Sequence, residues 1–355
     1  MEKIITLDYG SGGKKTSSLI ENYIVPAFRN DALAQLGDGA ILAGHERLVF
    51  STDSFVVSPY VFPGGDIGKL AVCGTVNDIA VSGGDPKYLS LALIIEEGFP
   101  ENDLARIIES ASKAAENAGV QVVTGDTKVV ERGRGDGIYI NTSGIGFLAH
   151  AGLSPENIRE GDTVLVSGNV GDHGAAVMLA RNKNLVEGEI LSDCADISGL
   201  AKALRPLGRD LRVMRDPTRG GVATTLCEFV EDRSAGSTAA QNPENAGAAQ
   251  RIKNAPCGIE LFEKEIPVSP MVAAACDILG LDPLYCANEG KLLAVVAKER
   301  AGEALALLRG TPGGENAAVI GTVTKAHPGK VTVQTPYGGS RILTKLAGAQ
   351  LPRIC

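Results

Sequence analysis

The sequence contains no tryptophan, and only 4% of its residues are aromatic. Few side chains are therefore available to stack on bases, on which proteins that bind single-stranded nucleic acids rely. The formal net charge is −8, whereas binding to a phosphate backbone needs a basic surface. We therefore expect the protein to have no nucleic acid partner.

Long apolar runs are also missing. The longest, at residues 89–95, falls far short of the roughly 20 residues that a membrane-spanning helix needs. The first residues, Met1–Thr6, lack the apolar core of a signal peptide. We expect a cytoplasmic protein with no membrane partner.

No pair of cysteines has the C-x-x-C spacing that is typical of zinc and iron–sulfur sites. In a cytosolic chain, most cysteines are expected to be small buried hydrophobes. The sequence has seven: Cys73, Cys194, Cys227, Cys257, Cys276, Cys286 and Cys355. Core packing does not explain Cys355, because it is the last residue of the sequence.

The length of 355 residues, with 44% hydrophobic and 21% charged residues, is typical of a globular protein of two domains. A polar segment at 151–160 separates two series of predicted helices and strands. We predict an α/β (α+β) fold with an N-terminal domain at 1–150, a C-terminal domain at 151–326, and a small hairpin with a flexible tail at 327–355.

Hydrophobic periodicity and turn residues predict the individual elements. Asp66 is expected to cap one helix and Gly119 to end the next. The arginines at 205, 209, 212 and 215 are expected on one helical face, and residues 234–255 as a mobile loop. Predicted strands are 4–7, 41–43, 49–53, 89–95, 120–128, 138–147, 163–167, 292–297, 330–335 and 341–346, and predicted helices are 66–82, 103–118, 171–181, 271–279 and 302–309.

The glycine-rich segment Gly10–Thr16 resembles a P-loop, but Asp8 and Tyr9 stand where a Walker A motif needs its first glycine. Successive backbone N–H groups of Gly10, Ser11, Gly12 and Gly13 can still form an anion nest over phosphates. A flexible N-terminal arm is the other interpretation, and the spacing alone leaves both open.

Three aspartates, Asp38, Asp53 and Asp78, fall at predicted strand or helix ends within a short stretch of chain. Each alone is a common turn or cap residue, but together they make a divalent-cation site plausible. Asp126 follows another strand, at a sheet edge where ligands usually bind.

Two segments of the second half also suit a site. Thr218 and Arg219 precede a helix whose free N–H groups favour an anion. His173 opens another helix, where it is either catalytic or hydrogen-bonded scaffolding. Cys355 carries a thiol on a chain end that is long enough to reach a cleft, and by itself it is either a substrate group or incidental.

Eight motifs extend over nearly the whole chain in the order of one known family. They are Gly10-Ser-Gly-Gly13, Gly37-Asp-Gly-Ala40, Ser51-Thr-Asp-Ser-Phe55, Gly74-Thr-Val-Asn-Asp-Ile-Ala80, Gly125-Asp-Thr-Lys128, Arg215-Asp-Pro-Thr-Arg-Gly-Gly221, Ala287-Asn-Glu-Gly290 and Pro352-Arg-Ile-Cys355. Together they resemble the carbamoyl dehydratases of hydrogenase maturation, in the superfamily of aminoimidazole ribonucleotide synthase and selenophosphate synthase. Tyr9 departs from the histidine that is usual in this family.

The resemblance implies an N-terminal domain that dimerises through its sheet and binds ATP near the domain and subunit junction. The glycine-rich segment would close over the phosphates. The residues implied to hold Mg²⁺ are Asp38, Asp53, Asp78 and Asp216, with Asn77 and Asp126 nearby, and Thr218 and Arg219 suit the nucleotide.

The resemblance also implies that a carbamoyltransferase loads Cys355 and that ATP-dependent loss of water leaves a thiocyanate. The cyanide then passes to iron on a hydrogenase maturation scaffold. Either Glu265 or Lys128 is the expected base, and the sequence leaves the choice open. Two alternatives remain: an ATP-using enzyme that acts on a small-molecule amide, and an ATP-gated scaffold.

Overall fold

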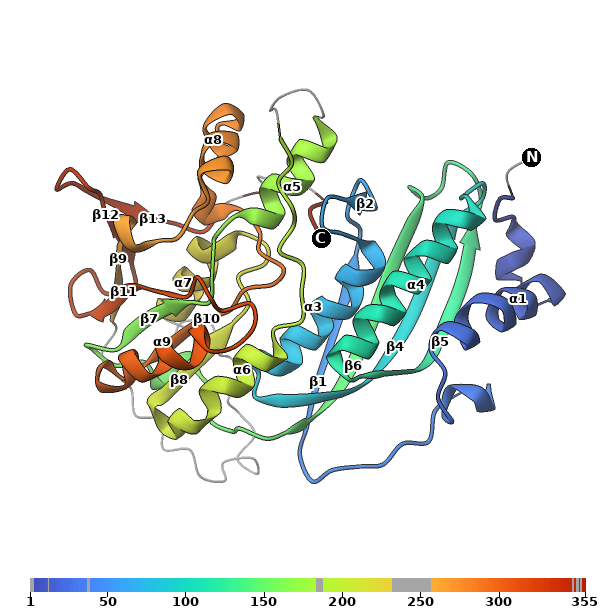
Figure 1. Cartoon of the computed structure of the whole chain (residues 1–355), viewed down its shortest axis with the longest axis horizontal. Coiled ribbons are helices and arrows are strands. Elements are labelled where there is room, and N and C mark those ends of the chain that lie inside the picture. The colour runs from blue at the N-terminus through green and yellow to red at the C-terminus, as the bar shows by residue number, and fades with distance from the viewer. Residues whose placement is uncertain are drawn as a thin grey trace, which may run out of the picture.

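The computed structural model describes residues 3–11, 13–36, 39–182, 188–231, 257–346, 348, 351 and 353–355. It contains two α/β units that lie side by side, each built on its own sheet (Figure 1). The predicted loop at 234–255 lies outside the described residues. The predicted domain boundaries stay a prediction, although residues 48–148 form the first sheet and residues 163–343 the second.

The first sheet has four strands in the order β1 (Leu48–Phe55), β6 (Ile138–Leu148), β4 (Gly84–Glu96) and β5 (Gln121–Val130). β6 pairs antiparallel with both β1 and β4, whereas β4 and β5 are parallel. Helices α3 (Ile67–Val81) and α4 (Glu101–Ala118) cover one face of it (Figure 1). The short elements nearby are α1 (Lys14–Leu19), α2 (Val25–Ala27), β2 (Val61–Phe62) and β3 (Gly65–Asp66).

The start of α3 and the end of α4 are each set by one residue. The Asp66 carboxylate accepts the free N–H groups of Gly68 and Lys69, which makes it the predicted N-cap. Gly119 ends α4 with φ +65°, a conformation that glycine adopts without strain. Both predictions are confirmed.

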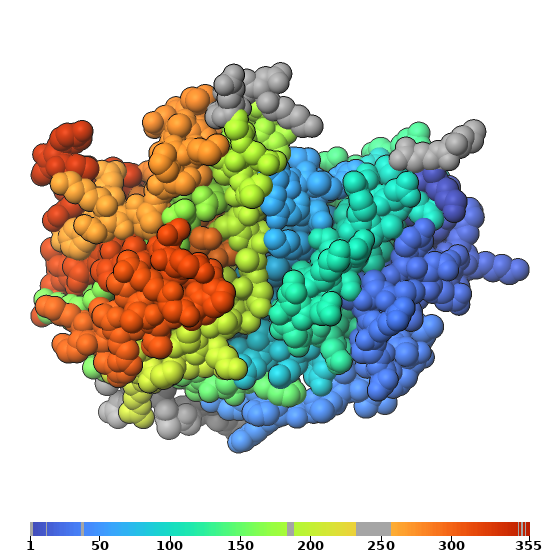
Figure 2. Space-filling view, viewed as in Figure 1, coloured from blue at the N-terminus to red at the C-terminus, as the bar shows by residue number. Residues whose placement is uncertain are grey.

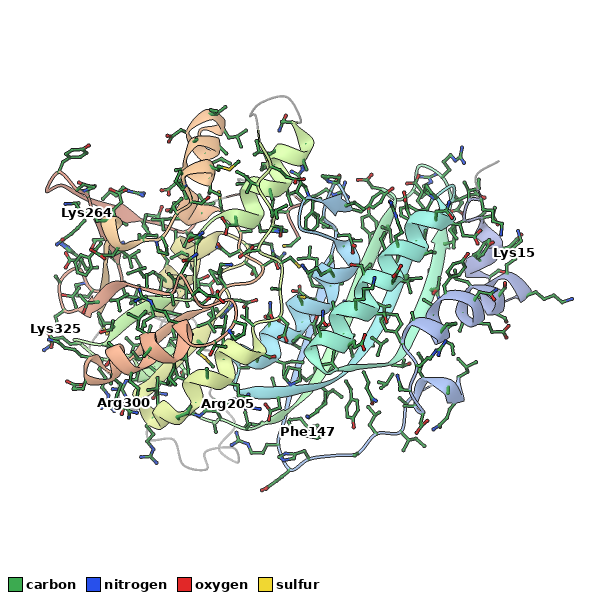
Figure 3. All side chains as sticks on the ribbon, viewed as in Figure 1. Lys15, Phe147, Arg205, Lys264, Arg300 and Lys325 are labelled. Atoms are coloured by element: carbon green, nitrogen blue, oxygen red, sulfur yellow. The ribbon has the colours of Figure 1, made fainter. Side chains whose placement is uncertain are left out.

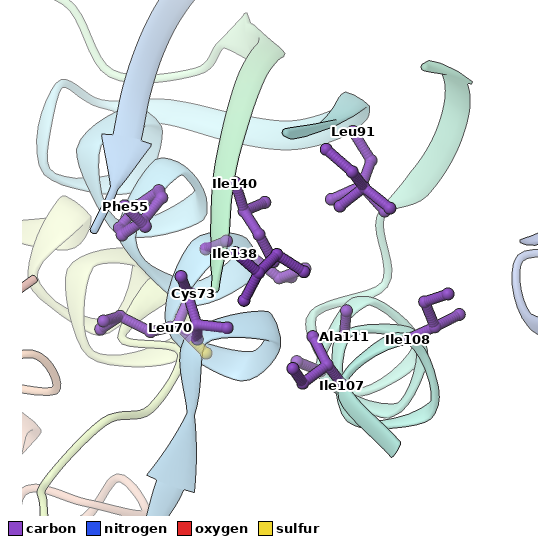
Figure 4. Packing of buried hydrophobic residues seen from close by; sticks show 14 of the residues in the cluster. Phe55, Leu70, Cys73, Leu91, Ile107, Ile108, Ala111, Ile138 and Ile140 are labelled. Carbon is purple, nitrogen blue, oxygen red and sulfur yellow. The ribbon is translucent and has the colours of Figure 1, made fainter. Parts of the chain in front are cut away.

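Apolar side chains from α3, α4 and the sheet form the first core (Figure 4). Phe55, Leu70, Ile107 and Ile138 are buried there. A Cβ on Gly74 of α3 would lie 2.8 Å from the Phe55 ring, so the glycine lets this helix lie close to β1. β1 is thereby fixed against α3, and both elements carry acidic residues of the site.

The opposite face of this sheet carries exposed apolar side chains. Phe50, Leu48 and Ile94 all lie on it, and Phe50 is 66% exposed. No helix among the described residues covers this face in the single chain. An apolar sheet face that stays open to solvent is typical of an interaction surface.

The second sheet has seven strands, and helices pack on both of its faces. Along β7, Val164 and Val166 face one cluster with α7, while Leu165 faces another with α6 and α9, as the alternation of a strand requires. The strand order is β13 (Ser340–Leu343), β12 (Val331–Gln334), β9 (Gly258–Phe262), β11 (Ala318–Thr324), β7 (Thr163–Val166), β10 (Leu293–Val296) and β8 (Leu211–Arg215). The helices are α5 (Asp172–Arg181), α6 (Ser198–Leu204), α7 (Gly221–Val230), α8 (Pro270–Leu279) and α9 (Ala301–Arg309).

The two units are in direct contact along a seam (Figure 2). Ala80 and Val81, at the end of α3, pack into the cluster that α6 and α9 form. Arg205 donates hydrogen bonds to the Asp85 carboxylate and to the Gly84 carbonyl of the first unit. The described helices include none that is long and apolar enough to cross a membrane.

Three predictions of local structure are wrong. At residues 4–7, only Ile4 makes an isolated bridge, and a 3₁₀ helix begins at Leu7. Residues 41–43 form no strand. The row of arginines is not one helical face, because Arg205 and Arg209 lie on a 3₁₀ helix while Arg212 and Arg215 lie on β8. Their recurrence at helical spacing is coincidental.

Arg212 instead forms a buried ion pair. Its Nε lies 3.1 Å from Oδ2 of Asp162, and both side chains are less than 10% exposed. Replacing Arg212 by methionine leaves a buried carboxylate without its partner, so we expect a loss of about 3 kcal/mol of unfolding free energy. Chemical denaturation of Arg212→Met measures it. The exposed Arg209→Met is the matched control, and equal stability of the two variants would contradict this assignment.

Candidate active site

The last three residues lie at the seam and are held there by backbone hydrogen bonds. The Val56 N–H donates to the Cys355 carbonyl over 3.1 Å, and the Ser58 N–H donates to the Arg353 carbonyl over 3.2 Å. The side chain of Ile354 is buried in the first core. The sequence predicts a mobile tail, whereas the structure docks its end beside the segment that follows β1.

Three of the four predicted magnesium ligands face one another near this tail. Asp53 lies on β1, Asp78 on α3, and Asp216 directly after β8. Burial, followed by the charge of Asp78, raises the pKa of Asp216 to about 7. Burial and the same charge raise the pKa of Asp53, while Arg219 opposes the shift. Asp38 lies outside the described residues.

Asp53, Asp78 and Asp216 suit a hydrated magnesium ion that also binds phosphates. Among the described residues, no three His, Cys, Asp or Glu side chains are close enough to hold a metal by themselves. Mg²⁺ usually keeps several waters and takes one or two carboxylates together with substrate phosphates. Burial first, and then the repulsion among these carboxylates, raises the pKa values of Asp53 and Asp216, although Arg219 and Arg215 oppose the two shifts. A divalent cation would stabilise the charged form of all three groups, so the residues fit the ion.

Glu289 belongs to the motif Ala287-Asn-Glu-Gly290, but the sequence alone gave it no role in the site. It is only 2% exposed, and its Oε1 accepts no hydrogen bond from the described residues. Burial, followed by the charges of Asp216, Asp193 and Asp53, raises its pKa well above the usual value. A buried, unpaired carboxyl group at a cluster of charges is a candidate acid or base. The signal was its place in that motif, as the one acidic residue between Leu284 and Val296.

The backbone around Glu289 is fixed from two sides. The Asp193 carboxylate accepts the N–H groups of Glu289 and Gly290, over 3.0 and 3.3 Å. A Cβ on Gly290 would lie 1.8 Å from the Asp193 carbonyl oxygen, so only glycine fits there. Glu289 is therefore held in one place.

Asn77 also holds this backbone. Its amide donates to the carbonyls of Ala195 and Glu289, over 3.0 and 3.3 Å, and its Oδ1 accepts the Ile197 N–H over 2.9 Å. Its polar atoms are thus already engaged with protein, and the side chain is buried. The structure therefore favours a structural role for Asn77, which links α3 to the second unit by hydrogen bonds, over the predicted contact with nucleotide.

The thiol of Cys355 faces this acidic environment. Burial, followed by the negative charges of Glu289, Asp53 and Asp216, raises its pKa far above the usual range, and Arg219 opposes the shift. The docked sulfur is therefore a neutral thiol, which is a poor nucleophile.

Thr218 and Arg219 lie where the sequence predicts, just before α7. The helix begins at Gly221, after the N-cap Gly220, and both glycines have positive φ. The Gly221 N–H donates to the Thr218 carbonyl over 2.9 Å. The Arg219 side chain is 73% exposed and lies 3.8 Å from Asp53. It is free to bind an anion that reaches the acidic cluster.

The remaining predicted nucleotide residues gather elsewhere in the chain. Gly10, Asp126 and Lys128 line a cavity of about 400 Å³ beside β5. Lys128 lies 2.6 Å from the Asp126 carboxylate, and both are exposed. A Cβ on Gly10 would lie 2.3 Å from the Val129 nitrogen, so the glycine allows the loop to approach the strand. Ser11 ends the 3₁₀ helix Leu7–Gly10, Gly13 is the N-cap of α1, and Gly12 lies outside the described residues.

A single chain keeps these two groups apart. Ser54 on β1 is in register with Asn141 on β6, which pairs with Ala92 on β4, which pairs with Asp126 on β5. Three steps between strands separate Ser54 from Asp126 by about 14 Å. The glycine-rich loop and Lys128 therefore lie across the sheet from the acidic cluster and Cys355.

Glu265 does not lie at either group. It is exposed on a short 3₁₀ helix, Glu263–Glu265. Its neighbour Lys264 lies at the outer edge of the second unit, far across the view from the C-terminus (Figures 1 and 3). The structure favours Glu289 over Glu265 as the glutamate next to Cys355.

The raised pKa of Asp216 predicts how stability depends on pH. Its value in the folded chain is about 7, against 3.8 for the ordinary group. Between these values the folded chain keeps a proton that the unfolded chain has lost, so the unfolding free energy falls as pH rises through this range and then levels off. Without divalent cations, we expect Asp216→Asn to stabilise the protein by about 2 kcal/mol at pH 8 and by less at pH 5.

Thermal melts in a chelating buffer at the two pH values measure this effect. Asp277→Asn, at an exposed position on α8, is the control and should shift neither melt. If Asp216→Asn is less stable than the parent at pH 8, the charged Asp216 carboxylate stabilises the folded chain, which contradicts the prediction.

Comparison with known proteins adds to this geometry. The family model of the AIR synthase related protein, N-terminal domain, matches residues 36–148. The model of the AIR synthase related protein, C-terminal domain, matches residues 159–239 and 245–334. The carbamoyl dehydratase HypE of Bradyrhizobium diazoefficiens is 47% identical to the chain over 356 residues, covering 99% of the chain and 96% of that relative.

Solved structures agree with this similarity. The hydrogenase maturation protein HypE in complex with ATP matches with a TM-score of 0.88 and 43% identity, over 99% of both chains. HypE in a HypE–HypF complex matches with a TM-score of 0.74 and 44% identity, over 93% of this chain and all of that one. These matches extend over both sheets and the seam between them.

Proposed function

Since the chain belongs to the HypE family of carbamoyl dehydratases, within the AIR synthase related proteins, we propose that it dehydrates a carbamoyl group carried on its own Cys355. It uses ATP, and the product is a thiocyanate whose cyanide serves hydrogenase maturation. The observation that carries the proposal is the docked Cys355 thiol beside Glu289, a buried carboxyl group with an unpaired oxygen.

ATP and Mg²⁺ are the groups that the site has to hold. A family member has been solved with ATP, and the neighbouring carboxylates of Asp53, Asp78 and Asp216 suit a magnesium ion. When bound, ATP–Mg²⁺ supplies the phosphoryl group that makes the carbamoyl oxygen a leaving group. Arg219 and the start of α7 would bind phosphate oxygens.

Glu289 would accept one of the two protons that leave the carbamoyl nitrogen, and the other would leave with the departing phosphate. Its raised pKa gives the carboxylate a stronger hold on a proton than an ordinary glutamate has, which suits a base near neutral pH. Asp193 and Asn77 fix its backbone, so it is positioned before the substrate arrives. Glu289 is buried and Cys355 is partly buried against the first core, so little water reaches the group that forms.

Loading of Cys355 would take place with the tail undocked. In the docked position the raised pKa of the thiol disfavours the thiolate that attacks a carbamoyl donor. The loading partner is then a carbamoyltransferase, and the solved HypE–HypF complex supports such an encounter. The acceptor of the cyanide would be an iron-carrying maturation scaffold.

A second copy of the chain would complete the site. One chain separates Lys128, Asp126 and Gly10 from the acidic cluster by the width of the sheet. Pairing through the open sheet face would bury Phe50 and let one copy offer its glycine-rich loop to the other. A solution mass equal to that of the monomer, by light scattering, would argue against this arrangement.

The proposal is tested with protein that the carbamoyltransferase has loaded. Addition of ATP and Mg²⁺ should release cyanide upon thiolysis, in a single turnover per loaded chain, with one phosphate formed per cyanide. An enzyme for a small-molecule amide would instead turn over without loading. A scaffold gated by ATP would bind nucleotide and give no cyanide in any sample.

A further inference from the structure

Helix α5 contacts the docked tail from the second unit. His173, in its first turn, lies with Nε2 at 2.7 Å from the Ile354 carbonyl oxygen. Arg181, its last residue, donates from Nη2 to the Arg353 carbonyl oxygen over 2.6 Å. The same guanidinium donates from Nε to the Ser58 carbonyl over 2.6 Å, so it joins the tail, the first unit and α5.

A chain of hydrogen bonds fixes the His173 ring. The Cys194 N–H donates to Ser192 Oγ over 3.1 Å, and Ser192 Oγ lies 2.8 Å from His173 Nδ1. A neutral imidazole has one donor and one acceptor nitrogen. With the Ser192 hydroxyl donating to Nδ1, the proton lies on Nε2 and points at the Ile354 carbonyl. Phe62 packs edge-on against the ring, with centroids 5.3 Å apart.

Burial supports the neutral form. His173 is completely buried, and this burial lowers its pKa. A ring that stays neutral keeps Nε2 as a donor at the pH of the cell, so the contact does not depend on titration.

The contacts from α5 recognise the backbone of the tail and leave its last side chain free. Both carbonyl groups that α5 holds come before Cys355, and the Cys355 carbonyl itself is held by Val56. Arg353 has φ +53°, an uncommon conformation for a residue other than glycine, which its own contacts to Val56 and Asp136 maintain. None of these contacts uses the Cys355 sulfur, which is the atom that would carry the carbamoyl group.

We infer that His173 and Arg181 form a clip that sets the position of the Cys355 side chain against Glu289, with Ser192 fixing the donor nitrogen of His173. They are positioning residues, since neither contacts the reacting atoms. The inference rests on the proposed function for its purpose, but the docking itself is measurable without any chemistry.

The test is the rate at which iodoacetamide alkylates Cys355 in the full chain, without nucleotide or carbamoyl donor, followed by peptide mass spectrometry. Docking leaves Cys355 only partly exposed and next to negative charges that disfavour the reactive thiolate, so alkylation proceeds mainly from the undocked fraction. His173→Phe keeps a buried ring but removes the donor, and we expect about tenfold faster alkylation. Arg181→Gln removes the hydrogen bond to the Arg353 carbonyl, so the alkylation rate of Cys355 should rise several-fold.

Two further variants separate positioning from general damage. His173→Gln keeps an N–H donor near the Nε2 position and should restore a rate within about threefold of the parent. Asn182→Ala removes a hydrogen bond to the Met178 carbonyl at the same end of α5 and should leave the rate unchanged. Melting temperatures of all variants show whether each one folds.

The clip is refuted if folded His173→Phe is alkylated at the parent rate, or if His173→Gln is alkylated as fast as His173→Phe. If His173→Phe does not fold, Ser192→Ala and Arg181→Gln decide, and a parent rate in both overturns the inference. If alkylation follows the predictions but loaded protein gives no cyanide, the proposed function fails while the clip stands. If single-turnover dehydration in His173→Phe slows in proportion to its undocked fraction, the clip and the proposed function are linked.

Discussion

Replacing Cys355 by alanine is expected to abolish formation of cyanide. The sulfur is the only atom of the tail that the proposal loads, so its removal leaves the site without a substrate. Loss should be complete within the limit of detection, and the assay is cyanide release after incubation with the carbamoyltransferase, its carbamoyl donor, ATP and Mg²⁺. Nucleotide binding should persist, because the acidic cluster of Asp53, Asp78 and Asp216 is unchanged.

The matched control is Cys227→Ala, which removes another partly exposed thiol on α7. This variant should give cyanide at the parent rate. Formation of cyanide by Cys355→Ala would show that another group carries the carbamoyl, and it would favour an enzyme that acts on a small-molecule amide.

Replacing Glu289 by glutamine should lower the single-turnover rate of dehydration by a factor of about 10² to 10⁴, the usual contribution of a general base. The amide keeps the size of the side chain but has no basic oxygen for a proton. Alkylation of Cys355 should not slow, because α5 and Val56 hold the tail without help from the Glu289 side chain.

Glu265→Gln makes the same chemical change at the glutamate that the sequence suggested. Glu265 is exposed, and its neighbour Lys264 lies at the outer edge of the second unit (Figure 3), so the rate of Glu265→Gln should stay within about threefold of the parent rate. If the dehydration rate falls strongly in Glu265→Gln and only slightly in Glu289→Gln, Glu265 is the base and the assignment to Glu289 is wrong.

Local patterns predicted the elements that carry the site. The cap at Asp66, the stop at Gly119 and the hydrophobic stripe of α3 are short-range signals, and the structure confirms them. The arginine spacing at 205–215 misled because its members lie on both a 3₁₀ helix and a strand. Burial of Arg212 against Asp162 depends on contacts that no local pattern contains.

The site was predictable only in part, because its residues meet through tertiary packing. Asp53, Asp78 and Asp216 were found from motifs, and the structure brings them together. Asn77 was assigned to nucleotide, since a sequence does not show that Ala195, Ile197 and Glu289 use its polar atoms. Glu289 was passed over because its unpaired oxygen is a property of the folded chain.

The tail illustrates the same limit. Its position at the chain end predicts a mobile segment, and nothing local indicates that His173 and Arg181 hold its carbonyl groups. A docked tail is compatible with loading by a partner only if it also undocks, so the docking free energy has to be modest. Alkylation rates of the parent protein therefore also measure how often Cys355 is available to the partner.

The most direct measurement is tandem mass spectrometry of the C-terminal peptide from loaded protein, with and without ATP. The account predicts that Cys355 carries a carbamoyl group without ATP and the same group less one water after ATP is added. An unchanged carbamoyl mass on Cys355, in a sample that consumes ATP and still forms cyanide, would contradict it.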